Sequence, residues 1–244
     1  MLGSVDATSS SMEALTKQYQ AIAHNLANAN TTGFKRQVTA FQQLLGTQVQ
    51  GANSSGDLTG TIDGRIAIDQ TQGPLTNTAR PLDVAIDGEG FFVIETPQGP
   101  LYTRNGSFDV NSQGQLVDSV GRTVSGEGGP ITLPGGVGLS QISVAPDGTV
   151  SAAGRNIGKL ALVRFSDTSV LEPVGQSCFK APQGVAPETA ASVKVRQYFQ
   201  ESSNVNVVEE LVGLIAVTRL YEANVKAIER QDEQTRNLLQ VAMS

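Results

Sequence analysis

The residues with the widest chemical repertoire gather in one short stretch near the N-terminus, AHNLANANTTGFKRQ (23–37). It contains His24, the chain's one histidine, followed by three asparagines and the basic pair Lys35-Arg36. Imidazole can bind a metal or transfer protons. A metal site needs further ligands, however, and the nearby carboxylate of Glu13 lies about three helical turns away. We therefore expect His24 to be a surface or packing residue, and the basic pair to be solvated or to form an ion pair between subunits.

The other candidate motifs for catalysis or ligand binding favour plain structural roles. Cys178 has no second histidine to activate it and lies in a predicted strand, so it is interpreted as a bystander thiol. DGEGFF (87–92) lacks the Gly-Lys-Ser/Thr of a phosphate-binding loop and leads into a strand, so it is interpreted as a hairpin turn. No Ser-His-Asp set, EF-hand spacing or carboxylate pair stands out. The sequence therefore predicts no catalytic, cofactor or metal site, and a protein that is not an enzyme.

Composition narrows the classes of partner. Seventeen Lys+Arg against 23 Asp+Glu give a net charge of −6, which disfavours nucleic acid because phosphate binding needs clustered basic residues. The longest apolar run, LVGLIAV (211–217), is too short to span a bilayer, so no membrane insertion is expected. The N-terminus has neither the basic nor the apolar region of a cleaved secretory signal, so none is expected. The single cysteine excludes an intramolecular disulfide.

Both ends of the chain have the period of amphipathic helices. Over 5–28, apolar residues recur at alternating spacings of three and four, which is typical of a heptad seam: they are Met12, Leu15, Tyr19, Ile22 and Leu26. Asn28 and Gly33 are expected to end this helix. Over 205–241, Asn206 and Glu209 have the spacing of a helix N-cap. A pair of helices buries only one seam, so we expect these helices to complete their packing against other chains.

The middle of the chain has a different pattern. From about residue 70 to residue 200, short apolar runs alternate with Asp-Gly, Asn-Gly and Gln-Gly pairs, which favour tight hairpin turns. The predicted fold class is α+β, with an all-β, hairpin-rich central domain flanked by long N- and C-terminal helices that pair in a coiled-coil-like helical domain. The predicted boundaries are 1–45 plus 201–244 for the helical assembly domain, 46–69 for a flexible connector and 70–200 for the β domain.

Three segments together resemble one protein family. They are NLANANTTGFKR (25–36), PLDVAIDGEGFFVIETPQGPLYTRNGSFDVNSQGQLV (81–117) and ESSNVNVVEELVGLIAVTRLYEANVKAIERQDE (201–233). In this order they resemble the flagellar basal-body rod and hook proteins. The resemblance implies a torque-transmitting structural subunit whose terminal helices form the inner layers of a tube and whose β domain lies outside them. It also implies export by the flagellar type III apparatus, a place in the periplasm-spanning rod, and other axial subunits as partners.

The resemblance also suggests which residues form the contacts between subunits. Asn25 and Asn28 share a helix face beside Leu26, so they could bond to neighbouring subunits or simply cap the helix, and Phe34 could anchor the turn on the β domain or on a neighbour. The full set of candidates is Leu15, Tyr19, Ile22, Asn25, Leu26, Asn28, Phe34, Leu211, Ile215, Tyr221, Val225 and Ile228.

The type of axial subunit is a further prediction. Hook proteins usually have a much larger β region, and GEGGPITLPGG (126–136) with a short connector resembles the proximal-rod type more than the distal-rod type. The alternatives are a distal-rod or hook-type subunit and, from a different class, a non-flagellar binding module whose helices form a dimerisation zipper.

Overall fold

The computed structural model describes residues 2–44, 61–190 and 193–242, which fall into two compact units. The helix–hairpin unit comprises residues 1–27, 37–69 and 206–244, and the β unit comprises 28–36 and 70–205. The chain therefore passes between the units at four points, which are 27/28, 36/37, 69/70 and 205/206. The expected flexible connector, 46–69, falls mostly on residues 45–60, which lie outside the described residues, and its end, Thr61–Ile68, is strand β2.

The helix–hairpin unit contains two α-helices and one pair of strands. Its elements are α1 (Leu2–Ala27), β1 (Gln37–Leu44), β2 (Thr61–Ile68) and α2 (Val207–Ala242). Helix α2 begins as predicted, because Asn206 Oδ1 accepts the Val208 N–H at 3.2 Å and Asn206 Nδ2 donates to Glu209 Oε1 at 3.0 Å. At 36 residues and 1.5 Å per residue, α2 is about 54 Å long.

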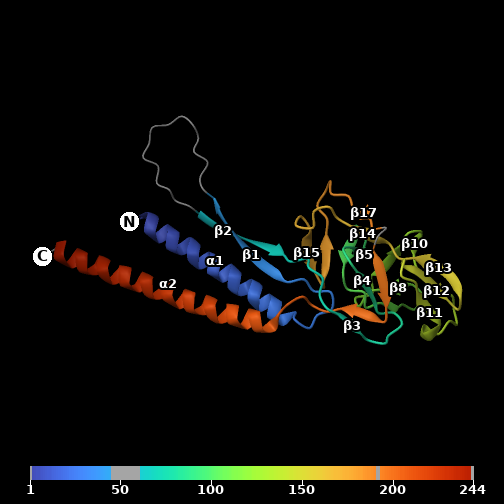
Figure 1. Ribbon diagram of the computed structural model, residues 1–244. Helices are drawn as coiled ribbons and strands as arrows, with labels where there is room; N and C mark the ends of the chain where they lie inside the picture. Colours follow the sequence, from blue (N-terminus) through green and yellow to red (C-terminus); the bar gives the residue numbers. More distant parts are fainter. Residues whose placement is uncertain (1, 45–60, 191–192, 243–244) are drawn as a thin grey trace. The chain divides into compact units, whose positions relative to one another are not determined.

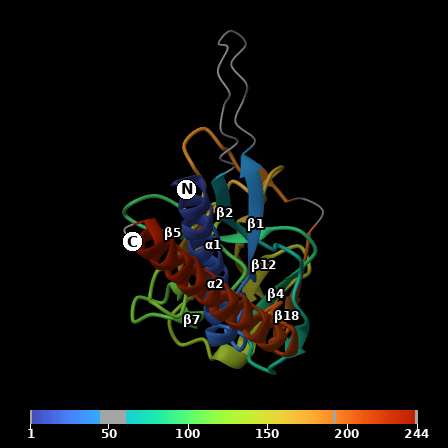
Figure 2. The ribbon, with the colours of Figure 1, turned by 90° about the vertical axis from the view of Figure 1, so that its left-hand side faces the viewer.

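Helix α1 lies between α2 and the strand pair. It runs antiparallel to α2 and contacts β1 and β2 as well (Figures 1 and 2). A glycine makes room for the other helix, because Ile22 of α1 packs against Gly213 of α2. Ala14 and Ala21 are also buried on α1, but at about 100° per residue they lie on the side of Asn25, whose side chain bonds to β1. On the part of α2 whose side chains are described, Val217 is the most deeply buried apolar residue, at 2% exposure. Gly213 therefore leaves room on α2 for a large side chain of α1.

The predicted fold class is wrong in its helical part. Among the described residues there are two α-helices and nineteen strands, so the chain is dominated by sheet, and the terminal helices do not form a coiled coil. Ile22 of the predicted seam packs against α2, but other large apolar residues are not covered: Tyr19, Leu211, Ile215 and Tyr221 are all more than 40% exposed. A heptad spacing shows that one face of a helix is apolar, but it does not show which element covers that face.

The β unit is built from short antiparallel strands. They are β3 (Leu75–Asn77), β4 (Val84–Asp87), β5 (Phe91–Glu95), β6 (Leu101–Thr103), β7 (Asp109–Val110), β8 (Leu116–Val117), β9 (Thr123–Gly126), β10 (Gly129–Pro130), β11 (Ile142–Val144), β12 (Thr149–Ala152), β13 (Arg155–Lys159), β14 (Leu162–Arg164), β15 (Glu172–Gly175), β16 (Cys178–Lys180), β17 (Glu188–Thr189), β18 (Lys194–Gln197) and β19 (Phe199–Glu201). A 3-10 turn, Leu139–Gln141, precedes β11.

These strands form one large sheet and several small ones. The main path of the ten-stranded sheet is β15-β16-β6-β5-β9-β8-β7; β11, β12 and β13 form a three-stranded sheet, and the pairs β18-β4 and β19-β3 join segments far apart in sequence. The predicted turn at Asp147-Gly148 connects β11 to β12, with Gly148 at φ +86°. Such a φ favours glycine in tight turns.

One apolar core holds the β unit together. Phe92 and Phe108 meet edge to face with ring centroids 5.1 Å apart, and both are essentially inaccessible to solvent. Branched residues from β4, β5, β9 and β11 complete the cluster, including Ile86, Ile94 and Ile142. This core provides a rigid base for the polar groups at the chain crossings.

Candidate functional site

The N-terminal motif around His24 forms the turn that follows α1. Asn25 is 1% exposed, and its side chain pairs with the backbone of Gln37: Nδ2 donates to the Gln37 carbonyl oxygen and Oδ1 accepts the Gln37 N–H, both at 2.8 Å. The amide thus acts as one rung of a β ladder and ties the end of α1 to the start of β1. The two predicted roles, capping and bonding to a neighbouring subunit, did not include this one.

The rest of the motif lies in the β unit. The Asn28 carbonyl accepts the Thr31 N–H at 3.0 Å, which makes a turn after the helix. Gly33 follows at φ +67°, and a Cβ there would lie 2.5 Å from the Asn105 backbone nitrogen. Its N–H donates to the Glu201 carbonyl oxygen at 2.7 Å. Phe34 is buried within this chain, so the turn is held against the β unit from both sides.

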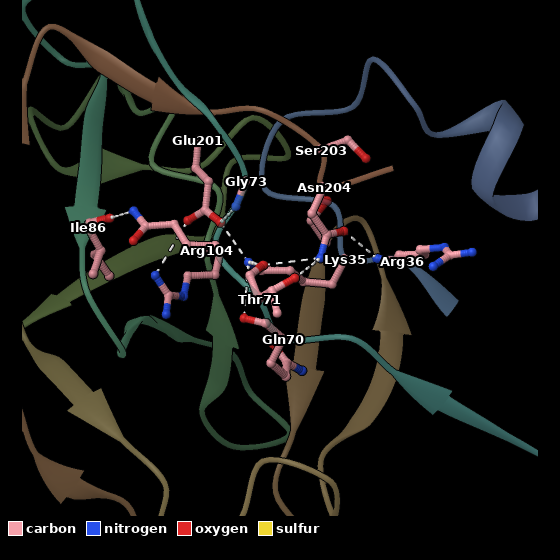
Figure 3. Close-up of polar contacts among 12 residues, drawn as sticks. Lys35, Arg36, Gln70, Thr71, Gly73, Ile86, Arg104, Glu201, Ser203 and Asn204 are labelled. Atoms are coloured by element: carbon pink, nitrogen blue, oxygen red, sulfur yellow. Dashed lines mark hydrogen bonds and ion pairs between the residues drawn. The ribbon is translucent and has the colours of Figure 1, made fainter. Parts of the chain in front are cut away.

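A buried ion cluster lies next to this turn (Figure 3). Lys35 Nζ is 2.6 Å from Glu201 Oε1, and neither side chain has any solvent exposure. Lys35 Nζ also donates to the Thr71 carbonyl oxygen at 2.6 Å, and Glu201 Oε1 accepts the Gly73 N–H at 3.0 Å. The prediction that Lys35 is solvated or paired with another subunit is wrong, because its partner is a carboxylate of the same unit.

Arg104 completes the cluster from the opposite side of Glu201. Its Nη1 lies 3.4 Å from Glu201 Oε2 and donates to the Gly88 carbonyl oxygen at 2.8 Å, while the guanidinium stands 5.3 Å from the centre of the Phe91 ring. Burial lowers the pKa of the Arg104 guanidinium, and the Glu201 carboxylate opposes that shift. Charges so completely enclosed cannot meet a substrate, so the cluster has a structural role.

The cluster gathers the segments that lead to the other unit. Besides Lys35 and Glu201, Asn204 joins two of these segments, because its Oδ1 accepts the Arg36 N–H at 2.7 Å and its Nδ2 donates to the Thr71 carbonyl oxygen at 3.1 Å. Residues just beside three of the four chain crossings are thus bonded to one another inside the β unit.

The candidate catalytic residues do not form a reactive site. His24 is exposed on α1. Cys178 is 2% exposed, and Arg122 Nη2 lies 3.1 Å from its Sγ. Burial raises the pKa of the Cys178 thiol, although Arg122 works against this effect, so the thiol is poorly reactive. Within the described ranges no group of His, Cys, Asp and Glu side chains is arranged to hold a metal ion.

Helix α2 has two apolar faces. One face contacts α1 through Gly213 and Val217. Since successive residues turn by about 100°, the second face points almost directly away from α1. We call this face the outer ridge; it consists of Val208, Leu211, Val212 and Ile215, which are 69, 46, 63 and 54% exposed. Apolar side chains grouped on a surface in this way are typical of an interaction site.

A groove runs along the same helix pair. It has a volume of about 360 Å³ and is lined mainly by apolar atoms. We call it the pair groove; its lining residues are Leu15, Thr16, Tyr19, Val217, Thr218, Tyr221 and Glu222. The groove and the outer ridge are thus two apolar surfaces of this unit.

The predicted subunit-interface residues divide by exposure. Tyr19, Leu211, Ile215 and Tyr221 are exposed, whereas Ile22, Asn25 and Phe34 are buried within the chain. The half-buried members are Leu15, Leu26, Asn28, Val225 and Ile228. A contact between subunits is not tested by a single chain, so these assignments stay predictions. Sequence reasoning missed Glu201, Arg104 and Asn204, since nothing in a sequence pairs Lys35 with a carboxylate 166 positions away.

Comparison with known proteins identifies the family. Three family models match: the flagellar basal-body rod protein model over residues 7–35, the flagellar hook protein FlgE/F/G D1 domain over 85–152, and the flagellar basal-body rod FlgEFG protein C-terminal model over 196–241. The rod protein FlgF of Caulobacter vibrioides is 33% identical over 227 residues, 93% of this chain and 92% of the relative. The chain belongs to the flagellar basal-body rod protein family.

Other rod proteins are similar over nearly their whole length. FlgF of Rhizobium meliloti is 36% identical over 92% of this chain and 90% of its own. FlgG of Buchnera aphidicola is 32% identical over 265 residues, 99% of this chain and all of its own. The relatives include both the proximal (FlgF) and the distal (FlgG) types of rod protein.

Membership of the rod family decides the class of function. Rod proteins are structural, and they assemble with other axial subunits in the flagellar basal body. This chain is therefore a structural subunit of the rod, as the three sequence segments predicted, and the binding-module alternative is not favoured. Neither helix, over its described residues, combines the length and apolar character needed to cross a membrane.

Proposed function

We propose that this rod subunit polymerises through its helix pair, with the outer ridge of α2 as a main contact between subunits. The observation that supports this proposal is the second apolar face of α2. A helix that packs one face against α1 needs no apolar residues on the opposite face, yet four large aliphatic side chains lie there with exposures of 46–69%. The remaining exposed candidates, Tyr19 and Tyr221, lie at the pair groove.

The energy available at this surface is sufficient for assembly in a polymer. Complete burial of a Val, Leu or Ile side chain contributes about 1.5–3 kcal/mol, and these four are roughly half buried already. Covering the outer ridge would therefore contribute about 3.5–7 kcal/mol per subunit before losses of entropy. That amount is modest for an isolated dimer, but a subunit in a tube has several neighbours, so such contacts add up.

In the proposed account, the buried ion cluster makes the β unit rigid where the chain leaves it. Lys35, Thr71, Glu201 and Asn204 bond three passing segments together. A rod that transmits torque requires subunits that do not yield at such points. The 1–45 and 201–244 segments would then supply assembly, and the 70–200 region would supply the outer layer.

We also propose the proximal, FlgF type of rod subunit. The alignment with FlgF of Caulobacter is 227 residues long, and 93% of this chain's 244 residues is also about 227. The alignment therefore opens hardly any gap in this chain. The alignment with FlgG of Buchnera extends over 265 positions and must open gaps in this chain. The subunit would reach the periplasm-spanning rod through the type III apparatus, and its partners would be other axial subunits, with no role for nucleic acid or membrane insertion.

The test replaces an outer-ridge residue with a charged one. Ile215→Asp is expressed in a flagellated host in place of the native subunit, and incorporation is measured in purified basal bodies. Val120→Asp is the matched control, because Val120 is 51% exposed on the β unit. We expect Ile215→Asp to be exported but absent from the rods, with loss of motility, and Val120→Asp to assemble. Motile cells with Ile215→Asp in their rods would overturn the proposal.

A further inference from the structure

The outer ridge and the pair groove lie on different sides of the same helix. At about 100° per residue, the ridge residues centre on one direction and Val217, Thr218 and Tyr221 centre roughly a quarter-turn or more away. A single subunit cannot cover its own groove with its own ridge, because both belong to one rigid helix. Each surface therefore needs an apolar partner from another chain.

Charge provides a second indication. Arg219 continues the line of the outer ridge, one turn after Ile215, and is exposed. Glu222 lines the pair groove and is also exposed. Among the described residues neither side chain has an ion pair. The ridge thus ends at an exposed positive charge and the groove carries an exposed negative one, three residues further along the same helix.

Symmetry decides how these surfaces can meet. If the ridge bound another ridge, the contact would be isologous and would close as a dimer. If the ridge binds a groove, the contact is heterologous, and one groove and one ridge stay free at the two ends of the assembly. Such a contact gives an open helix when its rotation does not close a ring. A rod is an open assembly, so only the second arrangement extends it; this step depends on the proposed function.

We propose that the outer ridge of one copy inserts into the pair groove of a second copy of this chain, with Arg219 of the first copy facing Glu222 of the second. Val212 and Ile215 enter the groove between Tyr19 and Tyr221. The groove volume of about 360 Å³ is large enough to admit several aliphatic side chains. A tyrosine at each side suits such a contact, because aromatic residues dominate the energetics of protein interfaces.

Cysteine cross-linking tests the arrangement directly. In a Cys178→Ser background, two copies are co-expressed in the host, one with Tyr19→Cys and one with Ile215→Cys, and basal bodies are oxidised. Ridge-in-groove packing predicts a covalent dimer when the two variants are co-expressed, and little product when either is expressed alone. A chain that carries both Tyr19→Cys and Ile215→Cys should give a ladder of oligomers. Cross-linking of Ile215→Cys to itself would overturn the inference, as would motile cells whose mixed rods give no cross-link.

Charge reversal gives an independent test. Arg219→Glu and Glu222→Arg should each lower incorporation into rods roughly tenfold or more, because each places like charges opposite one another. The double reversal should restore most of the incorporation. If both single variants assemble normally, or if the double variant assembles no better than either one, Arg219 does not face Glu222 of the next copy. If the charge reversals fail in this way but Ile215→Asp still abolishes assembly, the proposed function stands. Only the pairing of ridge with groove is then wrong.

Discussion

Replacing Glu201 with Gln is the sharpest perturbation of the buried ion cluster. Glu201 holds Lys35 at 2.6 Å, and the two side chains are wholly inaccessible to solvent. Gln keeps the shape of the side chain but removes the negative charge. The enclosed Lys35 ammonium then loses the negative charge of the Glu201 carboxylate, while the Thr71 carbonyl oxygen still accepts from it at 2.6 Å.

The expected cost follows from this enclosure. Removing one partner of a fully buried pair destabilises a protein by about 3–5 kcal/mol, because an uncompensated charge stays in the interior. For a domain of this size each kcal/mol lowers the melting temperature by about 2–4 °C, so the β unit should melt roughly 6–20 °C lower. Differential scanning calorimetry of the full chain, with the sheet signal followed by circular dichroism, measures this shift.

The chain offers a matched control. Arg164 and Glu188 are 2.7 Å apart in the same unit, but their side chains are 54 and 49% exposed. Glu188→Gln should cost about 0–1 kcal/mol, as exposed pairs do. The double variant Lys35→Met with Glu201→Gln should be less destabilised than the sum of its single variants. If Glu201→Gln melted within about 2 °C of the control, the reasoning about the cluster would be refuted.

Three further predictions concern single residues. Gly33→Ala should destabilise the β unit by more than about 1 kcal/mol, because the new Cβ adds strain at positive φ and collides with the backbone of Asn105. Gly128→Ala is the control, because its Cβ would meet nothing within 4 Å. Urea denaturation measures the free energy of unfolding of both variants. Asn25→Ala should cost roughly 2–4 kcal/mol by removing the side-chain partner of both backbone groups of Gln37. The Gln37 amide at the start of β1 should then exchange faster, and unchanged exchange would count against this pairing. Burial raises the pKa of Cys178, so at neutral pH Ellman's reagent should react slowly with the folded chain and quickly after unfolding; equal rates would contradict its burial.

Local patterns predicted the elements of this fold well. The N-cap at Asn206 has the predicted polar partners, and the Asp147-Gly148 turn connects two strands as expected. Both depend on interactions within a few residues, which the sequence displays directly. Helix α1 extends further towards the N-terminus than the predicted start, at Leu2, since no strong breaker interrupts that region.

The arrangement of the terminal helices could not be predicted in the same way. A heptad spacing marks apolar positions on α1, and Ile22 of that seam packs against Gly213 of α2, but Leu211, Ile215 and Tyr221 of α2 stay exposed. Strands β1 and β2 then occupy another side of α1. Periodicity marks the apolar face of a helix but not the element that covers it, and so it favoured a coiled coil that the chain does not form.

The buried charges show a different limit. Lys35 lies beside Arg36 in a basic pair that resembles an ordinary solvated surface. Its burial depends on Glu201, which is distant in sequence, and on the backbone carbonyl of Thr71. Long-range pairing of this kind leaves no periodic trace. The asparagine of the same motif, Asn25, was noticed as important, but its backbone partner, Gln37, becomes visible only once the chain has turned back.

The central claim is that the outer ridge of α2 is covered by neighbouring subunits in the rod. The most direct measurement is the accessibility of position 215 in a Cys178→Ser, Ile215→Cys subunit, probed with a small maleimide. Ile215 is 54% exposed in the single chain, so purified monomer should react rapidly. Intact basal bodies should be protected, and the reactivity should return when the same rods are dissociated. Equal labelling of monomer and intact rods would contradict the claim.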